Sequence, residues 1–341
     1  MQALVYTAHG AMEVRDEPRP RVHGDEVLIR VAHAGICGSE LEGFASRSPR
    51  RVPPLVMGHE FSGTIEDVGP DVITLKAGDP VVVNPLIVCG RCDMCLRGAS
   101  DVCRNRTLIG MGRPGGFAEL VTAPERAVFK LPPAVSLSQA AMVEPLANAV
   151  HAVRIANVSV PGARVMVMGT GTIGLVCLQM AVVAGASAVV AVDVDDARLK
   201  VAEALGATRV LNPRTGNPAL VRQEVTGTDG FDLVLDAVGR DETRRAGLEA
   251  LGPLGTAVWI GTGQDSMTLS GNEVVHQERR IQGSYAYTDS DFRRALALIV
   301  GGRVEVGSWT QQFPLSQGAD VFLGLLSGKR PGLIKAQLQP A

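Results

Sequence analysis

The second half of the chain alternates between short apolar runs and amphipathic stretches, a pattern that few folds can satisfy. The apolar runs are rich in β-branched residues and lie at residues 164–168, 188–192, 209–211, 232–235 and 256–260. The amphipathic stretches between them include residues 196–205, 218–225 and 241–251. Strands that are apolar on both faces and alternate with helices predict a parallel, doubly wound α/β sheet.

The first 150 residues have a different texture. Short β-rich segments at residues 2–6, 26–34, 61–68 and 80–83 are separated by turns such as Pro18-Arg19-Pro20 and Gly78-Asp79-Pro80. Near the end of the chain, residues 289–301 have a helical pattern and residues 333–337 a strand pattern. The sequence therefore predicts a β-rich domain in addition to the α/β domain, in keeping with a chain of 341 residues.

A glycine-rich turn directly follows the first apolar run of the second half. Met168 precedes Gly169-Thr170-Gly171-Thr172-Ile173-Gly174, a G-x-G-x-x-G sequence. Its glycines allow a tight turn, close approach of a pyrophosphate to the backbone, and close packing of helix on strand. Asp193 follows the next run, where a carboxylate binds ribose hydroxyls and repels a 2′-phosphate, so NAD is predicted over NADP. Arg198 either covers the adenosine ribose or is a solvated helix cation.

Four of the six cysteines, Cys89, Cys92, Cys95 and Cys103, are spaced as C-x2-C-x2-C-x7-C. Four thiolates suit one tetrahedral Zn²⁺ and leave no open position for chemistry, which predicts a structural zinc lobe at residues 84–107. Disulfides would need an oxidising compartment, and residues 1–14 lack the features of a signal peptide. The usual iron–sulfur run, C-x2-C-x2-C-x3-C-P, is not met.

Charge and hydropathy exclude two classes of partner. The chain has 33 Lys+Arg and 35 Asp+Glu, so no basic surface for nucleic acid is expected. Residues 173–192 contain only Gln179 and Ser187 as polar side chains, and their length would allow a membrane crossing. Gly185-Ala186-Ser187 interrupts this stretch, however, and favours a buried helix followed by a buried strand. A cytoplasmic protein without nucleic-acid or membrane partners is predicted.

Several short motifs together resemble the medium-chain zinc alcohol dehydrogenase family. They are Gly35-Ile36-Cys37-Gly38-Ser39, Gly58-His59-Glu60-Phe61-Ser62-Gly63, Gly115-Gly116-Phe117-Ala118-Glu119 and Glu144-Pro145-Leu146-Ala147, besides the four-cysteine lobe and the glycine-rich turn. The resemblance covers essentially the whole chain. It implies a GroES-like catalytic domain at residues 1–150, a Rossmann domain at residues 151–287, and a return to the catalytic domain at residues 288–341.

The resemblance also implies a second, catalytic zinc. Carried over to this chain, the family's ligands are Cys37, His59 and Glu144, with Glu60 as a further or exchangeable ligand. One thiolate, one imidazole and carboxylates make an open Zn²⁺ site with room for water or substrate. Simple alcohol dehydrogenases have a cysteine where Glu144 stands. A glutamate there is similar to the sorbitol, galactitol-phosphate and threonine dehydrogenases.

Residues around these ligands follow the family pattern only in part. Ser39 resembles the hydroxyl that passes the substrate proton outward, and Glu40 stands in place of the aspartate that orients the zinc-bound histidine. Glu42 replaces a histidine that often ends the proton relay, which leaves the exit route open. Ala286, beside Tyr287, replaces an arginine that touches the polyol in sorbitol dehydrogenases, so a plain sorbitol dehydrogenase is disfavoured.

The remaining polar candidates have simpler interpretations. Arg47, Arg50 and Arg51 precede the G-H-E motif and either meet a substrate phosphate or are exposed loop charges, which is the favoured interpretation. His151 is predicted to be a packing or hinge residue, and Cys177 a small residue of the core.

The predicted function is hydride transfer from a secondary alcohol, in a polyol, sugar alcohol or amino alcohol, to NAD. The cofactors are NAD and two zinc ions per chain, with Ile260 and Ser284 also expected beside NAD. An L-threonine or butanediol dehydrogenase is an alternative enzyme. A non-catalytic NAD-binding protein that keeps only the structural zinc is an alternative of another class. The resemblance implies a homodimer or homotetramer paired through the edge of the Rossmann sheet.

Overall fold

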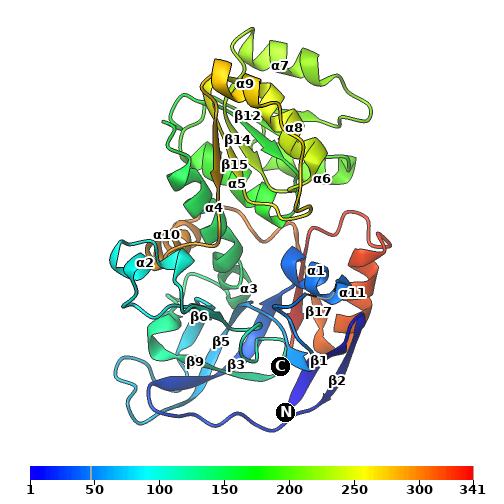
Figure 1. The fold of residues 1–341 in the computed structure, drawn as a ribbon. Coiled ribbons are helices and arrows are strands. Elements are labelled where there is room, and N and C mark those ends of the chain that lie inside the picture. The colour runs from blue at the N-terminus through cyan, green and yellow to red at the C-terminus, as the bar shows by residue number, and fades with distance from the viewer. Residues whose placement is uncertain (47, 341) are drawn as a thin grey trace. The chain divides into compact units, whose positions relative to one another are not determined.

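The computed structural model describes residues 1–46 and 48–340, and Figure 1 follows the chain through them. The chain divides into two compact units. The first consists of Met1–Glu144, Thr288–Gly302 and Val306–Ala341, and the second of Pro145–Tyr287 and Arg303–Glu305. The chain leaves the first unit in the first turn of α4 (Val143–Ile155), so residue 150 lies inside this helix. It returns to the first unit where α10 (Asp289–Val300) begins.

The second unit is built on a sheet with the strand order β13-β12-β11-β14-β15-β16. Its strands are β11 (Arg164–Met168), β12 (Ala188–Val192), β13 (Arg209–Leu211), β14 (Phe231–Asp236), β15 (Leu251–Trp259) and β16 (Arg280–Gly283). Its helices after α4 are α5 (Thr172–Val183), α6 (Asp196–Ala204), α7 (Pro218–Thr226), α8 (Asp241–Ala250) and α9 (Gly271–His276). Each neighbouring pair of strands is parallel. The predicted doubly wound fold is therefore confirmed.

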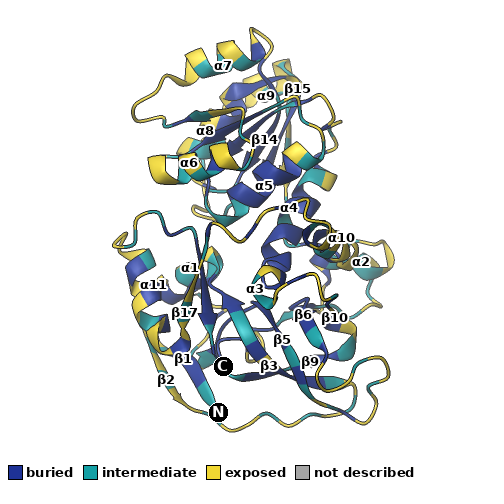
Figure 2. Cartoon of the chain, turned by 180° about the vertical axis from the view of Figure 1, so that it is seen from behind, coloured by how far each residue is buried: buried dark blue, intermediate teal, exposed yellow. Residues whose placement is uncertain are grey.

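The apolar stretch at residues 173–192 supplies the core of this unit. It divides into α5 and β12, which are both mostly buried, and Figure 2 shows α5 buried within the unit. Leu175, Val176 and Val190 are fully buried, because a parallel strand is covered by helices on both faces. No helix in the described ranges, 1–46 and 48–340, is long and apolar enough to cross a membrane.

The glycine-rich turn joins β11 to α5 with very little space. Gly169 has a φ of 84°, in the left-handed region that glycine adopts without strain. A Cβ on Gly174 would lie 1.7 Å from the carbonyl oxygen of Gly169, whereas a Cβ on Gly171 would meet nothing within 4 Å. Gly174 is therefore required for packing of helix on turn. The space beside Gly171 is open, so a phosphate could approach its backbone closely.

The first unit is centred on β3 (Glu26–Gly35). The strand order β10-β6-β5-β3-β18-β17 describes its larger sheet, with β9 also paired to β3. The other strands of this sheet are β5 (Glu60–Val68), β6 (Pro80–Val83), β9 (Leu120–Pro124), β10 (Val128–Lys130), β17 (Thr310–Pro314) and β18 (Lys335–Gln339). A smaller sheet has the order β2-β1-β4, with β1 (Gln2–Ala8), β2 (Ala11–Asp16) and β4 (Leu55–Val56). A β-rich first domain is thus confirmed, and residues near the C-terminus complete its sheet.

Helices cover this unit at positions that the sequence pattern did not indicate. They include α1 (Gly38–Ala45), α3 (Leu137–Ala140) and α11 (Gly318–Leu326). The ring of Phe44 in α1 lies 5.6 Å from that of Phe322 in α11, which also contacts Phe117 at 5.8 Å. These buried aromatic contacts hold α1, and with it the segment that follows Cys37, against the core.

Replacing Gly174 with alanine should destabilise the second unit, because the new methyl group collides with the backbone of Gly169. We expect a loss of about 1–3 kcal/mol in the free energy of unfolding. Gly171→Ala is the matched control, because Gly171 has an ordinary φ of −70° and open space around its Cβ position. Thermal unfolding of both variants measures the difference. Equal melting temperatures would contradict this account of the turn.

Candidate active site and metal centres

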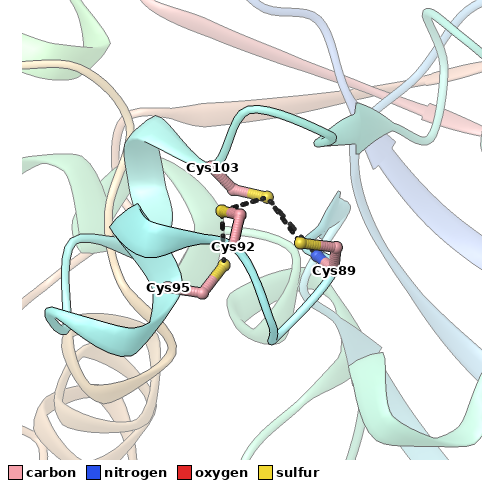
Figure 3. Close-up of side chains that lie close together, drawn as sticks. All are labelled: Cys89, Cys92, Cys95 and Cys103. Atoms are coloured by element: carbon pink, nitrogen blue, oxygen red, sulfur yellow. Dashed lines mark hydrogen bonds between the residues drawn. The ribbon is translucent and has the colours of Figure 1, made fainter.

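The four clustered cysteines converge in a loop that contains α2 (Asp93–Leu96) and the short turn Ser100–Val102 (Figure 3). The Sγ atom of Cys92 lies 3.6 Å from that of Cys95 and 3.8 Å from that of Cys103, and Cys103 lies 3.5 Å from Cys89. Four sulfurs around one Zn²⁺, each about 2.3 Å from it, are about 3.8 Å apart. All four are free thiols. Their geometry therefore fits the tetrahedral site that the spacing predicted.

The pKa values of the thiols in this lobe also favour binding of a cation. Backbone amides of Arg91 and Cys92 lower the pKa of Cys89 to about 6. Desolvation and the thiols of Cys103 and Cys92 raise the pKa of Cys95 to about 12. Crowded thiols cannot all ionise unless a positive charge lies among them. A divalent ion in the centre would remove this conflict and join the ends of the loop.

A second group of possible ligands lies in the first unit. The ligand atoms of Cys37, His59 and Glu60 all lie within 4.8 Å of one another. Pairing of β3 with β5 brings them together, because Gly35 lies opposite Glu60 in the ladder and Cys37 follows β3 at the start of α1. His59 and Glu60 are buried. A thiolate, an imidazole and a carboxylate form a donor set that suits Zn²⁺.

Glu40 holds this group in place from α1. Its Oε1 lies 2.7 Å from His59 Nδ1 and accepts a hydrogen bond from the Gly58 amide at 2.9 Å, while its Oε2 accepts from the Cys37 amide at 3.1 Å. Nδ1 can donate to Glu40 and leave Nε2 as the ligand atom. The longer side chain of Glu40 thus makes the contact with His59 that was expected of an aspartate at this position.

Burial and opposite charges compete in this contact. Burial lowers the pKa of His59, but the negative charges of Glu40 and Cys37 outweigh it and raise the pKa well above its usual value. Burial raises the pKa of Glu40, but the charges of His59 and Arg51 hold it below its usual value. Glu40 therefore remains a carboxylate that accepts hydrogen bonds.

Lys335 belongs to the same buried group and is absent from the sequence prediction. Its side chain is fully buried, and its Nζ donates to the carbonyl oxygen of Ile36 at 3.0 Å and to the Glu60 carboxylate. Burial lowers the pKa of Lys335, but Glu60 and Cys37 raise it above its usual value. The sequence itself offers only a lysine within a short C-terminal segment that has a strand pattern. Only the antiparallel pairing of β18 with β3 reveals its partner.

Ser39 lies beside Cys37, and Arg51 holds it there. Ser39 Oγ donates to Cys37 Sγ at 3.4 Å, while the guanidinium of Arg51 donates to Ser39 O at 2.9 Å and to Ser39 Oγ at 3.0 Å. The prediction of exposed loop charge is therefore wrong for Arg51, which is only 5% exposed and whose Nη1 and Nη2 donate to Ser39 in α1. Arg50 is exposed as predicted, and Arg47 lies outside the described residues.

Other predicted residues lie elsewhere in the fold. Glu144 is buried in the first turn of α4, and its carboxylate is not among the three donors that lie within 4.8 Å of one another. Glu42 is exposed on α1. His151 is buried in α4 with its Nδ1 2.9 Å from Arg154 Nη2, in keeping with a packing residue. Burial raises the pKa of Cys177 to about 12, as for an inert core thiol.

The candidate cofactor residues gather at one edge of the second unit's sheet. Gly169, Asp193, Ile260 and Ser284 each follow directly on β11, β12, β15 or β16, and parallel strands end at the same edge. Ligands bind at this carboxyl edge in open α/β sheets. The amides of Ile260 and Ser284 donate to Asp236 O and Trp259 O, both at 2.9 Å, so these loops are held by backbone hydrogen bonds.

Asp193 is fixed at that edge by the glycine-rich turn. Its Oδ2 accepts hydrogen bonds from Thr170 N at 2.7 Å and from Thr170 Oγ1 at 2.9 Å, and its Oδ1 accepts from Asp195 N at 3.0 Å. A carboxylate has about four acceptor positions, so capacity remains for a ribose hydroxyl. Arg198 Nε lies 3.8 Å from Asp195 Oδ2, on α6 beyond Asp193.

Loss of one thiolate should affect the two metal centres differently. Cys92→Ser should lower the melting temperature and remove about one zinc per chain, because metal binding to the lobe contributes to folding free energy. Cys37→Ser should keep a melting temperature near that of the wild type, because Glu40 and Lys335 still hold the surrounding segments. Metal analysis and thermal unfolding measure both effects. Equal destabilisation by the two changes would contradict the division into a structural and an open centre.

Comparison with known proteins gives the same assignment for both units. Residues 23–133 match the alcohol dehydrogenase GroES-like domain, and residues 172–301 match the zinc-binding dehydrogenase domain. D-xylulose reductase A of Aspergillus oryzae is 34% identical over 316 residues, which are 89% of this chain and 88% of that protein.

Solved structures agree over the full length. Galactitol-1-phosphate dehydrogenase of Escherichia coli superposes with a TM-score of 0.92 at 28% identity, covering 100% of both chains. A protein of Sinorhizobium meliloti 1021 described as a zinc-binding dehydrogenase, solved with bound NADP, superposes with a TM-score of 0.91 at 29% identity, covering 99% of both chains. The chain therefore belongs to the medium-chain, zinc-dependent alcohol and polyol dehydrogenases, enzymes that use zinc and a nicotinamide cofactor.

Proposed function

We propose that this enzyme oxidises a secondary alcohol that carries a neighbouring polar group, in a polyol, sugar alcohol or amino alcohol, with NAD⁺ as the hydride acceptor. The observation that carries the proposal is the buried group of Cys37, His59 and Glu60, with Glu40 bonded to the histidine. These residues would hold an open metal site, at the place in the chain where the family resemblance expects one.

The protein groups around this centre have separable roles. Bound Zn²⁺ supplies a Lewis acid that lowers the pKa of a substrate hydroxyl. Cys37 and His59 supply its ligand atoms, and Glu40 keeps the imidazole in the orientation that presents Nε2. Glu60 is held by Lys335 and is the further or exchangeable ligand. Ser39 Oγ, next to Cys37, would accept the proton that the substrate hydroxyl releases and pass its own hydroxyl proton to solvent, because its side chain is only half-buried.

Glu144 is proposed to lie close to the metal and to select the substrate. A buried carboxylate accepts hydrogen bonds strongly, so it can bind a second hydroxyl or an ammonium group next to the reacting carbon. A cysteine at this position would accept only weakly. The names of the relatives support a polyhydroxylated substrate, since one is a xylulose reductase and another a galactitol-1-phosphate dehydrogenase.

The proposed cofactor is NAD, held at the carboxyl edge of the sheet by Gly169, Gly171, Thr172, Ile173, Gly174, Asp193, Arg198, Ile260 and Ser284. The open face of Gly171 and the fixed carboxylate of Asp193 support this proposal. The relative from Sinorhizobium meliloti 1021 binds NADP, so the carboxylate is the feature that must discriminate here.

Assembly and location are also proposals. A homodimer or homotetramer is expected by similarity to the family, and a cytoplasmic location is proposed. The predicted substrate is a small molecule, with no nucleic-acid or membrane partner.

Asp193 should make NAD⁺ the better cofactor, because an ionised carboxylate repels a 2′-phosphate. We expect the wild type to favour NAD⁺ over NADP⁺ by about 100-fold or more in kcat/KM. Asp193→Ser should reduce this ratio. Asp193→Asn is the control that removes the charge and keeps an acceptor for Thr170. Steady-state kinetics with both cofactors measure the ratio, and equal efficiency in the wild type would refute the assignment of Asp193.

Glu144 should matter most for substrates with a second polar group. Glu144→Ala should lower turnover of a vicinal diol or polyol by about 10- to 100-fold, as for loss of close support to a metal centre. Glu144→Gln is the matched control, since it keeps the size and one acceptor oxygen. NADH absorbance measures turnover of a diol and of 2-propanol in all three proteins. If 2-propanol is the best substrate of the wild type, or Glu144→Ala keeps full activity, the proposal for Glu144 fails.

The same experiments separate the enzyme from the non-catalytic alternative. About two zinc per chain and turnover of an alcohol agree with the proposed function. About one zinc per chain, with NAD binding and no turnover of polyols, amino alcohols or diols, would instead indicate a binding protein that keeps only its structural metal.

A further inference from the structure

Arg51 is a buried cation whose contacts are directed at Ser39. It lies in the loop after α1 and is only 5% exposed. Its Nη1 donates to Ser39 O at 2.9 Å, and its Nη2 donates to Ser39 Oγ at 3.0 Å. Its Nε is buried without a hydrogen-bond partner in the described part of the chain. A buried guanidinium is costly unless its donors are used, so these contacts need an explanation.

The fold leaves a defined space for this side chain. A Cβ on Gly43 would lie 2.7 Å from Arg51 Cδ, so Arg51 crosses α1 where the helix has no side chain. Gly43 has a φ outside the left-handed region, and the reason for glycine here is therefore room for Arg51 and not backbone conformation. The packing of Gly43 against Arg51 directs the guanidinium toward the first turn of α1.

The hydrogen bond from Arg51 restricts what the Ser39 hydroxyl can do. A hydroxyl has one donor and two acceptor positions, whereas a guanidinium can only donate and does not lose its proton in proteins. Arg51 Nη2 therefore occupies one acceptor position of Ser39 Oγ and cannot receive a proton from it. The hydroxyl hydrogen must point elsewhere, and Cys37 Sγ at 3.4 Å is its acceptor. One acceptor position remains available for a substrate hydroxyl.

We propose that Arg51 is a positioning residue for proton transfer, which holds the Ser39 hydroxyl with a lone pair available to the substrate and with its hydrogen directed away from it. This inference rests on the proposed function, because it assumes that Ser39 accepts the proton of an alcohol. Arg51 itself touches neither substrate nor metal in this account. It acts through Ser39, which takes the substrate proton on its free lone pair and releases its own hydroxyl proton to solvent, since the Ser39 side chain is only half-buried and the guanidinium cannot take up that proton.

The test compares Arg51→Ala and Arg51→Lys with Arg50→Ala, an exposed arginine one position earlier in the same loop. We expect Arg51→Ala to lower kcat for a polyol by about 10- to 100-fold with little change in KM or zinc content. Arg51→Lys, which keeps one donor, should recover part of the loss. Arg50→Ala should retain the wild-type kcat. Unchanged kcat in Arg51→Ala would overturn the proposal.

A double-mutant cycle with Ser39→Ala separates positioning from a general structural effect. If Arg51 acts through the hydroxyl, Arg51→Ala should cause no further loss of kcat in the Ser39→Ala background. A loss as large as in the wild-type background would overturn the proposal. Gly43→Ala gives a second approach if Arg51→Ala does not fold, because it displaces the guanidinium and keeps its charge. Gly43→Ala should lower kcat in the otherwise wild-type protein and should have no effect on kcat in the Ser39→Ala variant.

A structural measurement tests the same inference without turnover. In crystals of the Arg51→Ala and Gly43→Ala proteins, Ser39 Oγ should leave its position beside Cys37 Sγ, which is 3.4 Å away in the intact chain. A Ser39 side chain that stays in place in both variants would overturn the proposal. Failure of the wild type to oxidise any alcohol would refute the proposed function instead, and these crystals would still show whether Arg51 orients Ser39.

Discussion

The candidate catalytic centre depends on the empty space above Gly35. A Cβ on Gly35 would lie 2.2 Å from Glu60 Oε2 and 2.8 Å from Lys335 Cε, so no other residue fits without displacing this buried ion pair. Gly35 lies between β5 and β18, and its absence of a side chain lets Glu60 and Lys335 meet beside Cys37. Cys37, Glu60 and Lys335 thereby lie close together, although Glu60 and Lys335 are 275 positions apart in the sequence.

Buried charges at this centre are balanced in pairs. Lys335 neutralises Glu60, Glu40 is bonded to His59, and the positive charge of Arg51 also lowers the pKa of Glu40. Taking a single charge out of water costs several kcal/mol, whereas a hydrogen-bonded pair recovers most of that cost. The arrangement holds two carboxylates and a thiol close together before any metal binds. Such a preorganised site is the kind that keeps ligand atoms within the small tolerance that catalysis needs.

Local patterns predicted much of the fold and part of the site. The parallel sheet followed from apolar runs and helical stretches, because burial on both faces requires an apolar strand. Glu40 was expected beside His59 from the family resemblance, and the contact is present at 2.7 Å. Arg51 was wrongly expected in solvent, because a loop arginine carries no local sign of burial. Helices α1, α3 and α11 were also missed, since tertiary packing and not periodicity stabilises such short elements.

The sequence by itself determined the donor types and their spacing: four thiolates for one closed metal site, a cysteine and a histidine for an open one, and the glycine-rich turn with its acidic residue. These signals are local, because each depends on neighbours within a short segment. Only the tertiary structure decided that Lys335 meets Glu60 and that Arg51 meets Ser39. Lys335 and Glu60 are far apart along the chain, and no pattern within either segment specifies the other. Strand pairing and the space above Gly35 and beside Gly43 bring these residues together.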